Sequence, residues 1–265
     1  MNSNSPTYPK SWSDLPRRAW VTGAGKGIGR ALASRLANDG WTVFASSRTE
    51  SDLASLASED VAGNGKIIPL PLDINDAEAC AAAVREVCAE GKELGLVVLN
   101  AGTHSPTPAA TFDAMAVNKL IAINLCGTVN CLTPAMHQTR TQGVGKIAVV
   151  ASVAGYKGLP NAAAYCASKA GLIAMCESLK PELQSDGVDI CVINPGFVRT
   201  PLTDKNEFPM PFLMELDAAV DSIVTGLKGR AFEIAFPTRF VLILKFLRLL
   251  PDALYFKITA RMIAD

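Results

Sequence analysis

Residues 19–30 read Ala-Trp-Val-Thr-Gly-Ala-Gly-Lys-Gly-Ile-Gly-Arg, and their pattern predicts a strand, a loop and a helix. A short apolar run enters a glycine-rich turn, and apolar residues then recur at helical spacing. Gly23, Gly27 and Gly29 let the backbone turn sharply and approach a ligand closely. The amino end of the following helix offers unpaired N–H groups and a positive dipole end, which favour a pyrophosphate. The order of strand, loop and helix predicts a dinucleotide site, although the strict G-x-G-x-x-G spacing is absent.

A tyrosine and a lysine stand one helical turn apart in residues 165–169, Tyr-Cys-Ala-Ser-Lys, thirteen residues after Ser152. The phenol and the ammonium therefore share a helix face. A phenol titrates near ~10 in water, and a nearby cation favours the phenolate and lowers that pKa. The pair predicts a group that exchanges a proton with a carbonyl or alcohol oxygen. Taken alone, the same spacing also fits a surface cation lying over a ring.

Further short motifs follow the predicted strands in a fixed order. Together with the glycine loop and the Tyr165–Lys169 pair, they make the chain resemble the short-chain dehydrogenase/reductase family over about residues 16 to 236. The motif residues are Asp73 and Ile74 after the third strand, Asn100-Ala101-Gly102 after the fourth, Asn124 in a helix, Ser152 after the fifth, and Asn194-Pro195-Gly196-Phe197-Val198-Arg199-Thr200 after the sixth.

The resemblance implies that a hydride moves between nicotinamide C4 and a substrate carbonyl carbon. It implies that Tyr165 donates the proton, that Lys169 lowers the tyrosine pKa and bonds the nicotinamide ribose, and that Ser152 hydrogen-bonds the carbonyl. Asn124 would hold a water that links Lys169 to solvent, and its alternative is a helix amide bonded to nearby backbone. Asp73 resembles a residue that contacts adenine, and it also fits an ordinary cap of the helix near 76.

The end of the second strand distinguishes between the two nicotinamide cofactors. An acid about 20 residues beyond the glycine loop holds the ribose hydroxyls in NAD sites, but Arg48 ends this strand and Lys26 lies inside the loop. Arginine can grip a 2′-phosphate, so the two positions predict NADP(H), with two solvated surface cations as the alternative. The predicted cofactor-binding residues are Gly23, Gly25, Lys26, Gly27, Ile28, Gly29, Arg48, Asp73, Ile74, Asn100, Ala101, Gly102, Tyr165, Lys169, Pro195, Gly196, Val198 and Thr200.

Composition sets limits on the class of protein. The chain has 265 residues, 49% of them hydrophobic, and a formal net charge of zero, which suits one α/β domain and gives no sign of nucleic-acid binding. The seven cysteines form no C-x-x-C pair, so we expect free thiols in the cytoplasm. His104 and His137 lack partners at metal-ligand spacing, so we expect no metal site.

Apolar runs alternate with helical segments, which predicts a single-domain, Rossmann-type, doubly wound parallel sheet of about seven strands with helices on both faces. We expect a loose N-terminal arm at 1–16 that is not a signal peptide, the domain at 17–236, and an apolar helical extension at 237–265 packed on it. Pro181 predicts a kink or an early helix end. The predicted strands are 18–22, 41–46, 67–71, 96–99, 146–151, 188–193 and 232–236, and the helices are 27–38, 50–57, 76–90, 112–138, 162–184 and 215–228.

Two segments depart from the family pattern. Residues 200–214 carry three prolines with Phe and Met, which fits either an apolar lid over a hydrophobic substrate or plain packing over the cofactor. Residues 240–251 read Phe-Val-Leu-Ile-Leu-Lys-Phe-Leu-Arg-Leu-Leu-Pro, an apolar run too short to span a bilayer. It fits a subunit-interface helix, a flap over the substrate mouth or a membrane-surface helix, and the first two are favoured over the third.

The sequence therefore predicts an NADP(H)-dependent enzyme that interconverts a ketone or aldehyde with an alcohol, acting on a small-molecule and hydrophobic substrate. Its predicted catalytic residues are Ser152, Tyr165, Lys169 and Asn124. The alternatives are a 3-oxoacyl thioester reductase, which shares these residues, and a catalytically idle NADP-binding redox sensor. The resemblance also implies a homodimer or homotetramer joined through the helices near 112–138 and 162–184.

Overall fold

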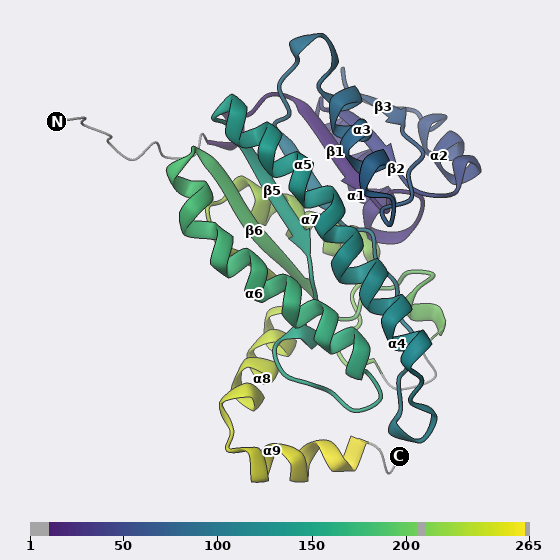
Figure 1. Ribbon diagram of the computed structural model, residues 1–265, viewed down its shortest axis with the longest axis vertical. Coiled ribbons are helices and arrows are strands. Elements are labelled where there is room, and N and C mark those ends of the chain that lie inside the picture. The colour runs from purple at the N-terminus through teal and green to yellow at the C-terminus, as the bar shows by residue number, and fades with distance from the viewer. Residues whose placement is uncertain (1–10, 206–209, 263–265) are drawn as a thin grey trace, which may run out of the picture.

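The computed structural model describes residues 11–205 and 210–262, and its core is one parallel sheet (Figure 1). The strand order is β3-β2-β1-β4-β5-β6-β7, with every neighbouring pair parallel. This confirms the predicted doubly wound sheet. The strands are β1 (Arg18–Thr22), β2 (Thr42–Ser46), β3 (Lys66–Pro69), β4 (Leu96–Leu99), β5 (Gly145–Val150), β6 (Val188–Pro195) and β7 (Glu233–Phe236).

Helices connect the strands, as parallel pairing requires. The α-helices are α1 (Gly27–Asn38), α2 (Glu50–Ala57), α3 (Ala77–Val87), α4 (Ala114–Ile121), α5 (Gly127–Gln142), α6 (Ala163–Ser185), α7 (Leu216–Lys228), α8 (Thr238–Leu249) and α9 (Asp252–Thr259). A π-helical segment, Ala122–Cys126, joins α4 to α5. Short 3-10 turns lie at Trp12–Asp14, Ala89–Gly91, Ala109–Thr111, Val153–Gly155, Thr203–Lys205 and Ala260–Met262.

Two hydrophobic layers cover the two faces of the sheet. In β1, Ala19 and Val21 pack with α1, α2 and α7, while Trp20 between them packs with α3, α5 and α6. Successive strand residues point to opposite faces, so a strand buried on both sides reads as a continuous apolar run. In the view of Figure 1, α5 and α6 lie in front of the sheet.

The strand order reverses between β1 and β4, because the chain adds β2 and β3 on one side of β1 and β4 to β7 on the other. In a sheet of this kind, the crevice at such a switch point lies beyond the carboxyl ends of the strands. The glycine loop after β1 and the Asn-Ala-Gly turn after β4 therefore meet there. This places the predicted motifs at one edge of the sheet.

Several predicted boundaries were wrong. The helix predicted at 112–138 is α4, the π-helical segment and α5, and it continues to Gln142. Of the two alternatives predicted for Pro181, a kink or an early helix end, the early end is wrong, since α6 runs through Pro181 to Ser185. Pro181 and Glu177, whose carbonyl loses its helical partner, are both exposed, so water can take that bond. β3 ends at Pro69 rather than 71, and β6 extends from the predicted 193 to Pro195.

Residues at both ends pack on the sheet domain. In the predicted N-terminal arm, of which residues 1–10 lie outside the described residues, the Trp12 ring is centred 4.9 Å from that of Trp41 and Leu15 is buried. At the other end, α8 buries Phe240, Val241 and Leu244 against Val153. Residues 263–265 of the predicted extension also lie outside the described residues.

One described helix, spanning Ala114–Gln142, is long and apolar enough by length and composition alone to cross a membrane. Its α5 part supplies Cys131, Leu132 and Ala135 to the layer that covers the sheet. The core helix of a soluble domain passes the same criterion, so the observation is weak evidence for a span.

A buried ion pair links β5 to β6. Lys146 and Asp189 are cross-strand neighbours, and Lys146 Nζ lies 2.9 Å from Asp189 Oδ2. The two side chains are only 5% and 10% exposed, and Lys180 also contacts Asp189. Replacing one partner leaves a buried charge without compensation.

We therefore expect Asp189→Asn to lower the free energy of unfolding by about 3–5 kcal/mol, because Lys146 keeps its charge in a dry site. Urea denaturation measures this change. Asp221→Asn is the matched control, since Asp221 pairs with Arg35 but is 63% exposed. That control should cost about 0–1 kcal/mol. Equal losses in the two variants would show that the Lys146–Asp189 pair has no special role.

Candidate functional site

The glycine loop is held against the β4 turn by the side chain of Asn100. Asn100 Nδ2 donates to the carbonyls of Thr22 and Gly23 at 3.1 and 3.2 Å. Thr22 Oγ1 in turn accepts from the backbone N–H groups of Asn100 and Ala101. A β-carbon at Gly29 would lie 2.3 Å from the Gly23 carbonyl oxygen, so only glycine fits there. Gly23 itself has a φ of +66°, which favours glycine.

The amino end of α1 is open to a ligand. Lys26 occupies the cap position, and its side chain makes no hydrogen bond to the first turn. The first N–H groups of α1 can therefore donate to a ligand. A β-carbon at Gly25 would approach Ser47 Oγ to 3.0 Å, and one at Gly27 would approach the Thr200 side chain to 3.3 Å. The missing side chains leave a cradle that fits the pyrophosphate of a dinucleotide.

The end of β2 carries a cation. Arg48 is exposed two residues after β2 ends at Ser46, and Ser46 Oγ accepts a hydrogen bond from Trp20 Nε1. Lys26 Nζ lies 3.5 Å from Asp52 Oδ2, in the first turn of α2. The nearby carboxylate is therefore bound to a lysine and does not occupy the strand end.

The segment after β3 is held by its own side chains. Asp73 Oδ1 accepts from the backbone and side-chain nitrogens of Asn75 at 3.0 and 2.9 Å. The cap of α3 is Asp76, which accepts from Ala79 N, so the prediction of Asp73 as a possible helix cap was wrong. Ile74 is buried, and its carbonyl accepts a hydrogen bond from Asn130.

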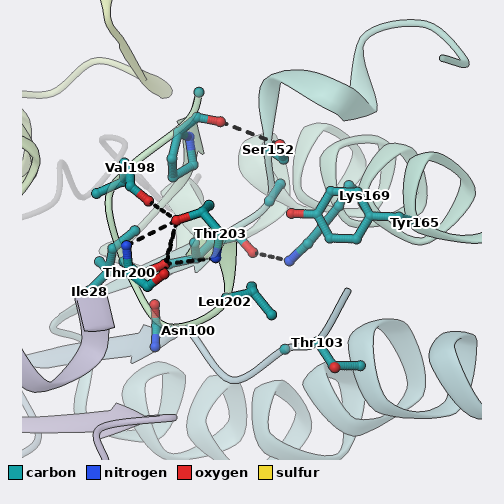
Figure 2. A pocket seen from close by; sticks show the side chains of 15 residues that line it. Ile28, Asn100, Thr103, Ser152, Tyr165, Lys169, Val198, Thr200, Leu202 and Thr203 are labelled. Carbon is teal, nitrogen blue, oxygen red and sulfur yellow. Dashed lines mark hydrogen bonds between the residues drawn. The ribbon is translucent and has the colours of Figure 1, made fainter. Parts of the chain in front are cut away.

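A small cavity of about 120 Å³ lies at the carboxyl ends of β4, β5 and β6 (Figure 2). Figure 2 shows the side chains of Tyr165 and Lys169 on one wall, pointing toward the strand end that carries Ser152. The lining residues are Ile28, Asn100, Gly102, Thr103, Val150, Ala151, Ser152, Tyr165, Lys169, Pro195, Gly196, Val198, Thr200, Leu202 and Thr203. The fold therefore brings three of the four predicted catalytic residues, and much of the predicted cofactor set, to one cavity.

Ser152 and Tyr165 are positioned by neighbouring backbone. Ser152 Oγ accepts from Ala154 N at 3.1 Å and donates to the Pro195 carbonyl at 3.3 Å. Tyr165 lies in the first turn of α6, one turn before Lys169. Burial raises the pKa of Tyr165 above its ordinary value, and a hydrogen bond with Ser152 acts in the opposite direction. The phenol therefore holds its proton at neutral pH.

Lys169 is a buried cation. Its side chain is held by a 2.9 Å hydrogen bond from Nζ to the Val150 carbonyl, and the residue is 4% exposed. Nζ lies 5.7 Å from the centre of the Tyr165 ring. Burial lowers the pKa of Lys169 to about 8, because a low-dielectric site disfavours the charged form. The group can therefore gain and lose a proton near neutral pH.

Asn124 lies beside the cavity rather than on its lining, in the π-helical segment. It is fully buried, accepts from Thr103 N at 2.7 Å and donates to Thr103 O at 2.9 Å. Its amide also reaches Ser168 Oγ at 3.2 Å. The backbone-bonded alternative therefore describes its present contacts. A β-carbon at Gly102 would lie 3.3 Å from Asn124 Oδ1 and 3.5 Å from Lys169 Nζ.

The structure adds residues that the sequence analysis did not assign to this site. The His104 ring meets Tyr165 edge-on at 4.8 Å between centroids, burial lowers its pKa, and its Nδ1 has no partner among the described residues. Leu202 and Thr203 line the cavity from the segment after β6. His104 lies in a loop and was considered only as a metal ligand. Leu202 and Thr203 lie at a short 3-10 turn within the predicted lid segment, where no spacing pattern marks single residues.

The two ends of the predicted lid segment at 200–214 are held together by backbone contacts. Val198 and Met214 form a parallel bridge, and Arg199 N donates to the Met214 carbonyl at 2.9 Å. Thr200 lies over Gly27, so this segment also touches the glycine loop. Residues 206–209, with one of the three prolines, lie outside the described residues.

Most of the chain matches a known protein family. The model of the short chain dehydrogenase family matches residues 17–209. The chain therefore belongs to the short-chain dehydrogenase/reductase family and is an oxidoreductase.

Two curated relatives and one solved structure are similar over most of the chain. An uncharacterized oxidoreductase of Myxococcus xanthus (strain DK1622) is 38% identical over 239 residues, covering 90% of this chain and 94% of that protein. A 3-oxoacyl-[acyl-carrier-protein] reductase of Staphylococcus aureus is 31% identical over 191 residues, covering 72% and 78%. The crystal structure of a short chain dehydrogenase from Burkholderia cenocepacia in complex with NADP has a TM-score of 0.78 at 26% identity, covering 90% and 95%.

The lowered pKa of Lys169 predicts a pH-dependent stability. Between pH 8 and 10.5 the unfolded chain keeps the Lys169 proton while the folded chain loses it, so the free energy of unfolding rises with pH. Below pH 8 the folding penalty is fully present, and above 10.5 it is absent. Lys169→Met lacks this contribution. We therefore expect the free energy of unfolding of wild type, minus that of Lys169→Met, to rise by about 3 kcal/mol from pH 8 to 10.5.

Urea unfolding at a series of pH values measures that difference. Lys66→Met, which removes an exposed ammonium from β3, is the control for the loss of one positive charge. A pH-independent difference for Lys169→Met would contradict the lowered pKa.

Proposed function

We propose that this protein is an NADP(H)-dependent oxidoreductase that interconverts a carbonyl and an alcohol on a hydrophobic substrate. The observation that carries the proposal is the shared cavity, in which a proton-bearing phenol, a buried lysine and a serine hydroxyl surround one space. This combination of groups can exchange a proton with a carbonyl oxygen and stabilise the charge that develops on it.

The cofactor preference rests on charge at the end of β2. An exposed arginine stands where an NAD site carries an acid, and Lys26 lies in the adjacent glycine loop. The Burkholderia cenocepacia relative was solved in complex with NADP, which supports the same cofactor here. Arg48 and Lys26 would hold the 2′-phosphate, and the open amino end of α1 would hold the pyrophosphate.

Ser152 and Tyr165 would act on the substrate oxygen. Bound in the cavity, the nicotinamide supplies or takes up the hydride. Ser152 has one O–H donor, which now points to the Pro195 carbonyl at 3.3 Å, so it would turn to donate to the substrate carbonyl. Tyr165 keeps its proton until the developing alkoxide requires it. The protonated form of Lys169 then stabilises the phenolate that remains.

Proton resupply would pass through Lys169. Its pKa of about 8 lets it release and regain a proton at small cost. We assign Asn124 to hold a water between its Oδ1 and Lys169 Nζ, where Gly102 has no side chain to fill the gap. The bonds from Asn124 to Thr103 fix the amide for this role.

Apolar side chains of the segment beside the cavity favour an apolar substrate. Leu202 lines the cavity and is 37% exposed, and Phe212 on the same segment is 44% exposed and packs on Phe240. A 3-oxoacyl thioester is the second candidate substrate, because the Staphylococcus aureus relative is a reductase of that class. Its acyl chain would also need an apolar channel.

We also propose a homo-oligomer joined through α4–α5 and α6. Within Ala114–Gln142, only 33% of the most apolar stretch of 18 residues is buried in a single chain. An apolar helix left this open in a single chain supports burial against a second copy.

We expect Tyr165→Phe to lower kcat by at least about 100-fold, because it removes the proton donor, and to leave NADPH affinity within about twofold. NADPH oxidation measures turnover, on small ketones, long-chain aldehydes, steroid ketones and 3-oxoacyl thioesters. Tyr255→Phe is the matched control, since its hydroxyl is bonded to Gly158 outside the cavity.

Turnover with one substrate class, lost only in Tyr165→Phe, would identify that class and separate the two candidates. Substantial turnover by Tyr165→Phe would overturn the assigned role. Tight NADPH binding without turnover on any substrate would favour an idle redox sensor.

We expect Arg48→Ala to weaken NADPH binding by roughly 10- to 100-fold while NADH binding changes little, because one charge-assisted hydrogen bond is lost. Titration of each nucleotide by fluorescence or calorimetry measures this. Arg85→Ala, which removes an exposed arginine from α3, is the matched control. If Arg48→Ala weakens both nucleotides equally, the NADP preference has another origin.

A further inference from the structure

The outer surface of α8 and α9 is apolar. On α8, Phe246 is 65% exposed and Leu249 is 80% exposed, and with Leu242 they recur at helical spacing along one stripe. A surface of this kind on a soluble domain marks a binding face. The exposed large apolar residues of the two helices and the turn after them are Leu242, Ile243, Phe246, Leu249, Leu254, Phe256 and Met262.

The inner surface of the same helices is already packed on the domain. Phe240, Val241 and Leu244 form a core with Val153 and Tyr156. Tyr255 of α9 is 2% exposed and bonded to the Gly158 carbonyl. The exposed residues are therefore a second face of docked helices and not a core that failed to close.

Positive charge accompanies the apolar face. Residues 238–262 contain five basic residues and one acid, in a chain whose net charge is zero. The acid, Asp252, is paired with Lys157 at 3.0 Å, and Lys245 is paired with Glu233. The remaining basic residues are all exposed: Arg239, Arg248, Lys257 and Arg261.

This charge distinguishes a lipid surface from a second copy. A twofold interface brings the same patch of both subunits together, so the basic side chains of one copy would face those of the other. An anionic lipid surface instead attracts each of them. A membrane-spanning role does not fit, because the helices have 12 and 8 residues.

We infer that the outer face of α8 and α9 binds the surface of an anionic lipid bilayer, with its apolar side chains among the headgroups and acyl chains. Figure 1 shows both helices at the end of the molecule toward which the carboxyl ends of the strands point. The cavity lies at those strand ends. Binding would therefore hold the catalytic end of the domain close to the lipid.

Vesicle cosedimentation with the full chain tests the inference without reference to activity. Vesicles of phosphatidylcholine alone are compared with vesicles that also contain phosphatidylglycerol. We expect binding to the anionic vesicles only, and loss of binding as the salt rises from about 0.1 to about 1 M, because the Debye length shortens from about 10 to about 3 Å.

Two variants separate the contributions of charge and apolar contact. Arg248→Glu/Lys257→Glu should weaken binding by at least about 25-fold, since each basic residue near an anionic surface contributes about fivefold. Phe246→Ser/Leu249→Ser should weaken it by at least about tenfold. Lys66→Glu/Arg85→Glu makes the same charge change on β3 and α3, and it should leave most of the binding intact.

Three results would overturn the inference. One is a wild-type protein that does not bind anionic vesicles, and this result needs no variant to fold. Another is equal loss of binding in the Lys66→Glu/Arg85→Glu control. The third is a protein that does not bind vesicles and forms an oligomer that Phe246→Ser/Leu249→Ser dissociates. That result would assign the face to a second copy.

Discussion

The glycine loop and the β4 turn hold each other in place across the switch point of the sheet. Asn100 reaches across the switch point and bonds two carbonyls of the loop, and Gly29 lets the loop close over its own helix. β1 and β4 are paired in the sheet, and this contact extends their fixed relation to the loop before α1. The cavity beside it takes one wall from Asn100 and Gly102, so the cofactor cradle and the proposed catalytic residues share one anchor.

A buried lysine sets the electrostatics of the cavity wall that Tyr165 and Lys169 form. Val150 ends β5 and accepts from Lys169, so strand and helix are joined at the point where Ser152 and Tyr165 face each other. Desolvation acts in opposite directions on the pair: it raises the pKa of the phenol and lowers that of the ammonium. Both groups are thereby moved toward their neutral forms. A bound anionic cofactor would shift this balance back toward the charged lysine.

The sheet and most of the site could be predicted because they depend on local patterns. Strand runs, the glycine loop and the Tyr165–Lys169 spacing each fix a backbone shape within a few residues. The errors have a different origin. Pro181 stays inside α6 because its helix face is exposed, and a π-helical segment divides the helix predicted at 112–138. His104 reaches Tyr165 from a loop. These outcomes depend on burial and on partners distant in sequence, which no local spacing records.

The α8 helix connects the C-terminal extension to the turn after β6 that lines the cavity. A β-carbon at Gly196 would lie 2.8 Å from the Phe240 ring, so the turn whose preceding carbonyl holds Ser152 rests directly on α8. Glu233 of β7 extends this link, since it bonds Asn194, Tyr156 and Lys245 of α8. Packed interfaces transmit small shifts because they resist compression. A contact on the outer face of α8 would therefore act on a helix whose inner face supports the turn that holds Ser152.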